Sequence, residues 1–126
     1  MLSRYRMIRG KRAPDDPLPK GIRMDTRKHT HHLLRPGAAS VEAVLRDGSD
    51  AAFRRFARDY TAGLEARFAK NRAGFDELAE TARHADLYLG CSCPSKANPD
   101  VRQCHTALAL KFMKKKYPDL RVVSPA

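Results

Sequence analysis

Apolar side chains recur at every third or fourth position between residues 50 and 68, which is the spacing of one face of an α-helix. Charged residues, among them Arg54, Arg58 and Glu65, occupy the opposite face. The pattern predicts a helix that is capped by Asp50 and buries its apolar stripe in the core. This stripe consists of Phe53, Phe56, Ala57, Tyr60, Leu64 and Phe68.

Three further helices are predicted around this one. A short helix is expected over residues 40–45, and the apolar spacing of three and four repeats over residues 75–84. Asn98 followed by Pro99 is typical of a helix start, with a capping side chain before a proline at the first helical position. We expect that last helix to run to about Lys116. Its inward face is predicted to hold Val101, Cys104 or His105, Leu108 and Phe112.

Short apolar segments over residues 4–9, 86–91 and 120–123 indicate strands, of which the second is buried. Helices of this length between strands imply crossover connections and therefore a parallel sheet. Residues 11–36 contain four prolines and no sustained period, so we expect an irregular basic loop there. The chain is predicted to be one α/β domain over residues 1–126, a small three-layer sandwich with a short, mostly parallel sheet flanked by helices.

Composition is typical of a soluble globular protein. Of 126 residues, 42% are hydrophobic and 31% are charged, which is too apolar for a disordered polyelectrolyte. No apolar run is long enough to cross a bilayer, and the first 12 residues hold five Arg or Lys but no signal-peptide stretch. We therefore expect a cytoplasmic protein without membrane contact. An odd count of three cysteines argues against a disulfide framework.

The net charge of +11 is concentrated at the two ends of the chain. Residues 1–36 carry 10 basic and 3 acidic side chains, residues 37–85 carry 8 of each, and residues 86–126 carry 7 and 3. If strands from both ends lie side by side, their charges add to one positive face. Such a face attracts nucleic acid or a phosphorylated small molecule.

Cysteine and histidine gather around the predicted buried strand. Cys91 and Cys93 stand at its end, and Cys104 and His105 follow in the early turns of the next helix. Open α/β sheets bind ligands at the carboxyl ends of their strands. A helix start also attracts anions and lowers the pKa of a nearby thiol. A site is therefore expected at this corner.

Three interpretations fit these residues. Cys93 or Cys104 is a reactive thiol with His105 as its base, or the four side chains bind zinc, or the cysteines only pack the core. Two residues on an extended strand lie about 6.6 Å apart at Cα, which disfavours zinc, so we expect no metal or other cofactor. A disulfide between Cys93 and Cys104 is geometrically open.

A second cluster of titratable groups lies in the irregular segment. This cluster consists of His29, His31 and His32. On an extended chain His29 and His31 point to the same side. They either join the cysteines as metal ligands or proton shuttles, or they are solvated loop residues. The glycine-rich dinucleotide fingerprint, the Walker loop, the zincin motif and the nucleophile elbow are all absent from the sequence. Dehydrogenases, P-loop enzymes, zincin proteases and α/β-hydrolases are therefore excluded.

Four short motifs follow one another along most of the chain: Tyr5-Arg6-Met7-Ile8, Pro19-Lys20-Gly21-Ile22, Phe56 with Tyr60 and Leu64, and Cys104-His105-Thr106-Ala107-Leu108. This order resembles the domain-of-unknown-function 488 family, especially its YeaO-like branch. The matching positions are Lys20, Gly21, Cys104 and His105. Lys20 stands where arginine is usual in the family, and Thr106 stands where the cysteine-bearing members have arginine.

The segment Leu89-Gly90-Cys91-x-Cys93-Pro94 with Cys104-His105 also resembles the domain-of-unknown-function 4326 family, whose Cys-x-Cys-x-Pro element precedes Cys-His at a shorter distance. Both resemblances imply a compact α/β fold with a Cys/His corner. Neither implies an established reaction.

The sequence therefore predicts a small basic protein that binds a phosphate-bearing ligand or nucleic acid beside Cys93, Cys104 and His105. The expected ligand contacts are Arg9, Lys11, Lys20 and Arg23, together with Gly21 from the family resemblance. Two alternatives stay open. One is a thiol-dependent or metal-dependent enzyme that uses Cys91 and the other residues of the corner, and the other is a binding module without chemistry.

Overall fold

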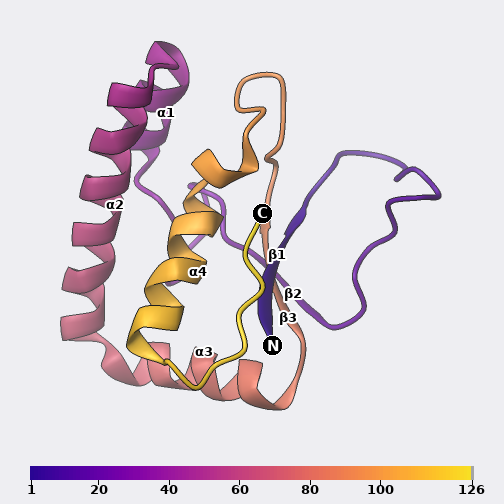
Figure 1. Cartoon of the computed structure of the whole chain (residues 1–126), viewed down its shortest axis with the longest axis vertical. Coiled ribbons are helices and arrows are strands. Elements are labelled where there is room, and N and C mark those ends of the chain that lie inside the picture. The colour runs from indigo at the N-terminus through magenta and orange to yellow at the C-terminus, as the bar shows by residue number, and fades with distance from the viewer. Residues whose placement is uncertain (126) are drawn as a thin grey trace.

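Three parallel strands form the centre of the computed structural model, which describes residues 1–125 (Figure 1). They are β1 (Leu2–Arg6), β2 (Ile22–Asp25) and β3 (Leu87–Cys91), in the order β1-β3-β2. The central position of β3 agrees with its composition, because four of its five residues are buried. The α/β class and the parallel sheet predicted from the sequence are confirmed.

The described part of the chain also contains four α-helices. They are α1 (Ala38–Asp47), α2 (Asp50–Lys70), α3 (Arg72–His84) and α4 (His105–Lys116), and a 3-10 turn, η1 (Val101–Gln103), precedes α4. The apolar stripes predicted for the two middle helices lie in the core. From α2 the buried aromatic and aliphatic residues are Phe56, Tyr60 and Leu64, and from α3 they are Phe75, Leu78, Ala79 and Ala82.

Side-chain alternation separates the two faces of the sheet. The register aligns Leu2 and Ile22 with Leu87, so these residues share a face with Leu89, which lies in the core. Figure 1 shows α2 and α4 on one side of the sheet and the segment that follows β1 on the other. In this three-layer arrangement the layer on the second face is thus the irregular segment 7–21 and not a helix.

Several predicted boundaries are wrong for identifiable reasons. Ser49, not Asp50, caps α2, because its hydroxyl accepts a hydrogen bond from the Ala52 amide. The last helix begins at His105 and not at Asn98. The Asn98 side chain donates instead to the carbonyl of Gln103 at 3.0 Å, so it stabilises the loop before the helix.

The strands also differ from the prediction. The first covers residues 2–6 and not 4–9, and residues 120–123 contribute only one bridge, between Leu2 and Val122. The segment 11–36 is not wholly irregular, because it contains β2. Four residues carry too little alternation to be recognised, and β2 is stabilised by its pairing with β3, more than 60 residues away. No helix in the described part of the chain is long and apolar enough to cross a membrane.

Candidate functional site

Three thiol groups meet at the carboxyl end of β3. Cys91 ends this strand, Cys93 follows in the loop, and Cys104 immediately precedes α4. Their sulfur atoms all lie within 4.8 Å of one another, and all three are free thiols. Cys91 and Cys104 are buried, whereas Cys93 is half-buried. The structure thus brings the predicted cysteines together, although Cys104 is 11 residues from Cys93 in the sequence.

The start of α4 explains how two consecutive residues reach the same site. Cys104 is the N-cap residue, with an extended backbone at φ −105° and ψ 150°, and His105 is the first helical residue. Within a helix, neighbouring side chains point about 100° apart, so only one of the pair would face the site. Because Cys104 lies outside the helix, both side chains line one pocket. The first amides of α4 also have no intrahelical acceptors, and they give this corner a positive dipole end.

The hydrogen bonds of Thr26 determine the tautomer of His105. The Thr26 hydroxyl donates its single proton to the carbonyl of Gly90 at 3.0 Å and lies 2.9 Å from Nε2 of His105. Nε2 must therefore donate to the hydroxyl oxygen, and Nδ1 carries the lone pair. That Nδ1 lies 3.7 Å from Sγ of Cys104. His105 is 4% exposed and is thus a buried, oriented proton acceptor beside a thiol.

The hydrogen bonds within the cluster favour the thiolate form of Cys104 over that of Cys91 or Cys93. Hydrogen bonds from the Cys91 and Cys93 thiols lower the pKa of Cys104 well below its ordinary value, and His105 adds to the effect once its Nδ1 has taken up the thiol proton and donates back to the sulfur. The pKa values of Cys91 and Cys93 are raised, chiefly because each thiol is hydrogen-bonded to Cys104. Thr106 donates a further hydrogen bond to Sγ of Cys104 at 3.2 Å. One thiolate is thereby stabilised by three hydroxyl and thiol donors.

Arg4 connects the elements that carry the cysteines. Its Nε donates to the Thr106 hydroxyl at 2.8 Å, and its Nη2 donates to the carbonyl of Cys93 at 2.6 Å. The guanidinium therefore ties β1 to both the cysteine loop and the start of α4. Sequence reasoning missed this residue because a strand arginine carries no local signal of such a role.

The cluster lies in the wall of a pocket of about 320 Å³. Its lining includes the thiols and His105 as well as apolar residues of α1 and Phe56. The cationic groups on the pocket are Arg27 and Lys28, next to His29. The apolar residues are Pro36, Val41, Val44, Leu45 and Phe56.

The cations on the pocket follow β2 and differ from the predicted ligand contacts. Arg9, Lys11, Lys20, Gly21 and Arg23 lie before or within β2, and within the described chain they do not line the pocket. Gly21 instead has a steric role, at φ +140°. A Cβ atom there would lie 2.5 Å from the carbonyl oxygen of Asp86. Arg27 and Lys28 were missed because β2, which positions them, was not predicted.

Both cations are paired with carboxylates. Arg27 forms a two-pronged pair with Asp25 at 2.8 and 3.0 Å, and these hydrogen bonds lower the pKa of the Asp25 carboxyl. Lys28 lies 3.1 Å from Glu42 on α1, and both side chains are exposed. The Arg27 pair is a bidentate, charge-assisted contact, whereas the Lys28 pair is a weak surface contact.

The three histidines of the segment after β2 have different surroundings. His29 is exposed on the pocket and lies 3.8 Å from Asp25, and His31 is exposed. His32 is turned inward: its Nδ1 accepts the Leu34 amide at 3.0 Å. Burial, with His105 nearby, lowers the pKa of His32. Of these three, only His29 can contact a ligand in the pocket.

Comparisons with models of known protein families, with curated proteins and with solved structures found no significant match for the chain. They neither support nor exclude the two family resemblances suggested by the motifs.

Proposed function

We propose that this protein binds a small phosphate-bearing molecule in the pocket between α1 and the cysteine cluster. The single observation that carries the proposal is the composition of this pocket. Cationic groups of Arg27 and Lys28 stand on one part of its wall and an apolar surface on another. A ligand that matches both parts has an anionic group and an apolar or planar group, as a nucleotide does.

Ion pairing of the two cations does not prevent phosphate binding. An exposed pair such as Lys28 with Glu42 contributes at most about 1 kcal/mol, so a phosphate can replace Glu42 at small cost. Arg27 uses Nε and Nη2 on Asp25, and its fork has five N–H donors in total. Donors therefore remain for a ligand, and Asp25 keeps the guanidinium in place.

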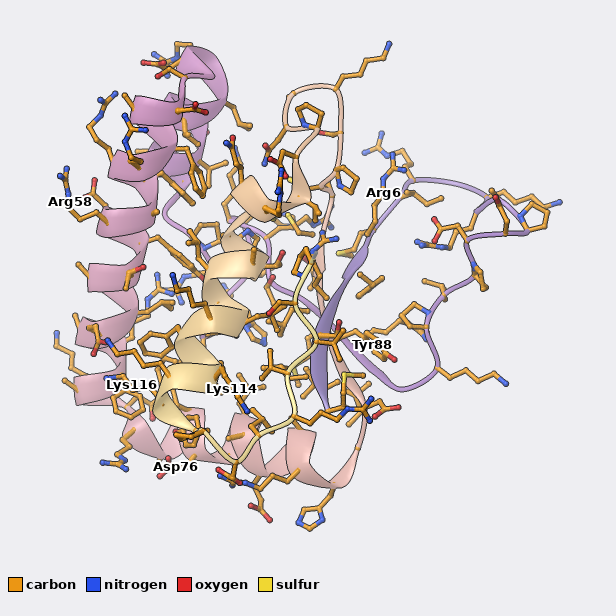
Figure 2. All side chains as sticks on the ribbon, in the orientation of Figure 1. Arg6, Arg58, Asp76, Tyr88, Lys114 and Lys116 are labelled. Carbon is orange, nitrogen blue, oxygen red and sulfur yellow. The ribbon has the colours of Figure 1, made fainter. Side chains whose placement is uncertain are left out.

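The pocket favours a small molecule over a nucleic acid. Its volume of about 320 Å³ is that of a small-ligand site. Among the described residues, the basic side chains that line it are Arg27 and Lys28. In Figure 2, Arg58 points outward from α2, whereas Arg6 lies on the opposite side of the molecule. Cations spread in this way do not form the continuous basic track that a nucleic-acid backbone follows.

The proposal is tested by titrating the protein with AMP and inorganic phosphate in a calorimeter. We expect AMP to bind more tightly than phosphate, and Lys28→Ala to weaken AMP binding. Lys20→Ala is the matched control, since it removes the same charge outside the pocket and should leave the affinity unchanged. Equal effects of the two substitutions would refute the proposal. So would a preference for a short single-stranded oligonucleotide with a steep salt dependence.

A thiol-dependent enzyme is the second candidate, and the contact between Cys104 and His105 favours it. A thiol 3.7 Å from an imidazole nitrogen on a pocket wall is the arrangement of an activated nucleophile. For an enzyme, Cys104→Ser should keep the affinity for AMP and abolish any turnover of phosphorylated compounds, followed by phosphorus NMR. For a binding module, both proteins leave every compound unchanged.

A further inference from the structure

We propose that Cys91, Cys93 and Cys104 together bind one thiophilic metal ion, Zn²⁺ or Cu⁺, through their three sulfur atoms. The proposal rests on the same pocket as the proposed function but does not depend on the phosphate ligand. It differs from the expectation drawn from the sequence, which disfavours a metal because residues two apart on an extended chain lie about 6.6 Å apart at Cα. In the structure β3 ends at Cys91, and the loop after it returns Cys93 to the cluster.

The distances between the sulfur atoms suit a metal ion. Zinc-to-sulfur bonds are about 2.3 Å long, so the sulfurs of a tetrahedral site stand about 3.8 Å apart. The three sulfurs lie within 4.8 Å of one another, so closing onto an ion requires each to move by about 1 Å or less. Thiolates are the ligands that Zn²⁺ and Cu⁺ prefer, whereas Mg²⁺ and Ca²⁺ prefer oxygen. The donor set therefore selects a thiophilic cation.

Donors around the cluster point at the sulfur atoms. The side-chain amide of Asn98 donates to Sγ of Cys93 at 3.3 Å, and the hydroxyl of Thr106 donates to Sγ of Cys104 at 3.2 Å. Arg4 in turn orients Thr106. Hydrogen bonds of this kind orient metal ligands and stabilise the negative charge of thiolates.

The pocket supplies the remaining coordination position. His105 does not complete the group, because its Nε2 is bonded to Thr26 and its Nδ1 lies outside the set of atoms within 4.8 Å of one another. All three cysteines line the pocket, so a fourth ligand comes from that side. Water or a phosphate oxygen is the suitable ligand there, as in zinc sites that keep an open position.

The test uses the full-length protein, reduced and prepared without chelators. Competition with a zinc-specific and a copper(I)-specific chromophoric chelator measures binding of each metal, and Co²⁺ substitution gives a sulfur-to-cobalt charge-transfer band. We expect one ion per chain, and a loss of affinity of at least about tenfold in Cys93→Ser and in Cys104→Ser. Ser92 lies between Cys91 and Cys93 in the sequence, so Ser92→Ala is the control. This variant should bind the metal ion with the affinity of the parent protein. Cys93 is the first choice for substitution because it is half-buried, and circular dichroism verifies that each variant folds.

Saturation by Zn²⁺ alone or by Cu⁺ alone supports the proposal and identifies the ion. The proposal is overturned if the folded protein binds neither ion, or if its three thiols alkylate at the same rate with and without metal. A folded Cys93→Ser variant that keeps full affinity overturns it as well. AMP titration of the metal-free protein distinguishes failure of the metal proposal from failure of the proposed function. A protein that binds AMP but no metal ion refutes only the metal site.

Discussion

The hydrogen bond between Thr26 and His105 can be tested by removing the hydroxyl group. Thr26 is fully buried, and Thr26→Val leaves the Nε2 proton of His105 without an acceptor. A buried donor left unsatisfied costs about 1–3 kcal/mol, and the lost bond to Gly90 costs about 1 kcal/mol. The Gly90 carbonyl still accepts the amide of residue 26 at 3.1 Å, so it is not left without a donor. We expect the free energy of unfolding to fall by about 2–4 kcal/mol.

A double-mutant cycle isolates the part that belongs to His105. In a His105→Phe background no imidazole proton remains, so Thr26→Val should then cost only about 1 kcal/mol. Urea denaturation of the four proteins, followed by circular dichroism, gives the coupling energy. A coupling below about 0.5 kcal/mol, the limit at which independent sites add, would refute the assigned tautomer and the orientation of His105.

Three further predictions concern pH, the metal site and the backbone. His32 has a lowered pKa, so its protonation favours the unfolded chain. The free energy of unfolding in urea should therefore be highest above pH 6.5 and fall below that pH. His32→Gln should remove this part of the pH dependence. Arg4→Lys keeps the charge but loses the planar guanidinium that hydrogen-bonds Thr106 and the Cys93 loop, so the metal affinity should fall by about 10–100-fold. Arg6→Lys is the control and should leave the metal affinity unchanged. Equal metal affinities in the two variants would contradict the role of Arg4. In urea titrations, Gly21→Ala should lower the free energy of unfolding more than Gly48→Ala does. Both substitutions carry the conformational cost of about 1–2 kcal/mol, but only at Gly21 does the new methyl group also meet a backbone carbonyl. A smaller loss of stability at Gly21 than at Gly48 would contradict the close approach to Asp86.

Local patterns in the sequence were sufficient to predict the helices that build the core and the central strand. The stripes of α2 and α3 and the apolar segment of β3 are recognisable because burial repeats with the period of the backbone within a single element. Helix ends were less predictable. Ser49, next to the predicted cap, and Asn71, several residues before the predicted start at residue 75, supply the capping oxygens, and several polar side chains there could have done so.

The sequence by itself also indicated the thiol and imidazole groups of the candidate site: three cysteines and a histidine around the end of a buried strand. Only the tertiary structure decided their arrangement. The sulfur atoms converge because the chain turns after Cys91 and because α4 starts at His105, and Arg4 holds both segments from β1. The cations on the pocket likewise depend on β2, a strand of four residues stabilised by pairing with β3. Contacts between segments so far apart in the chain produce no periodic pattern in the sequence, because the two contacting residues lie too far apart to belong to one helix or strand.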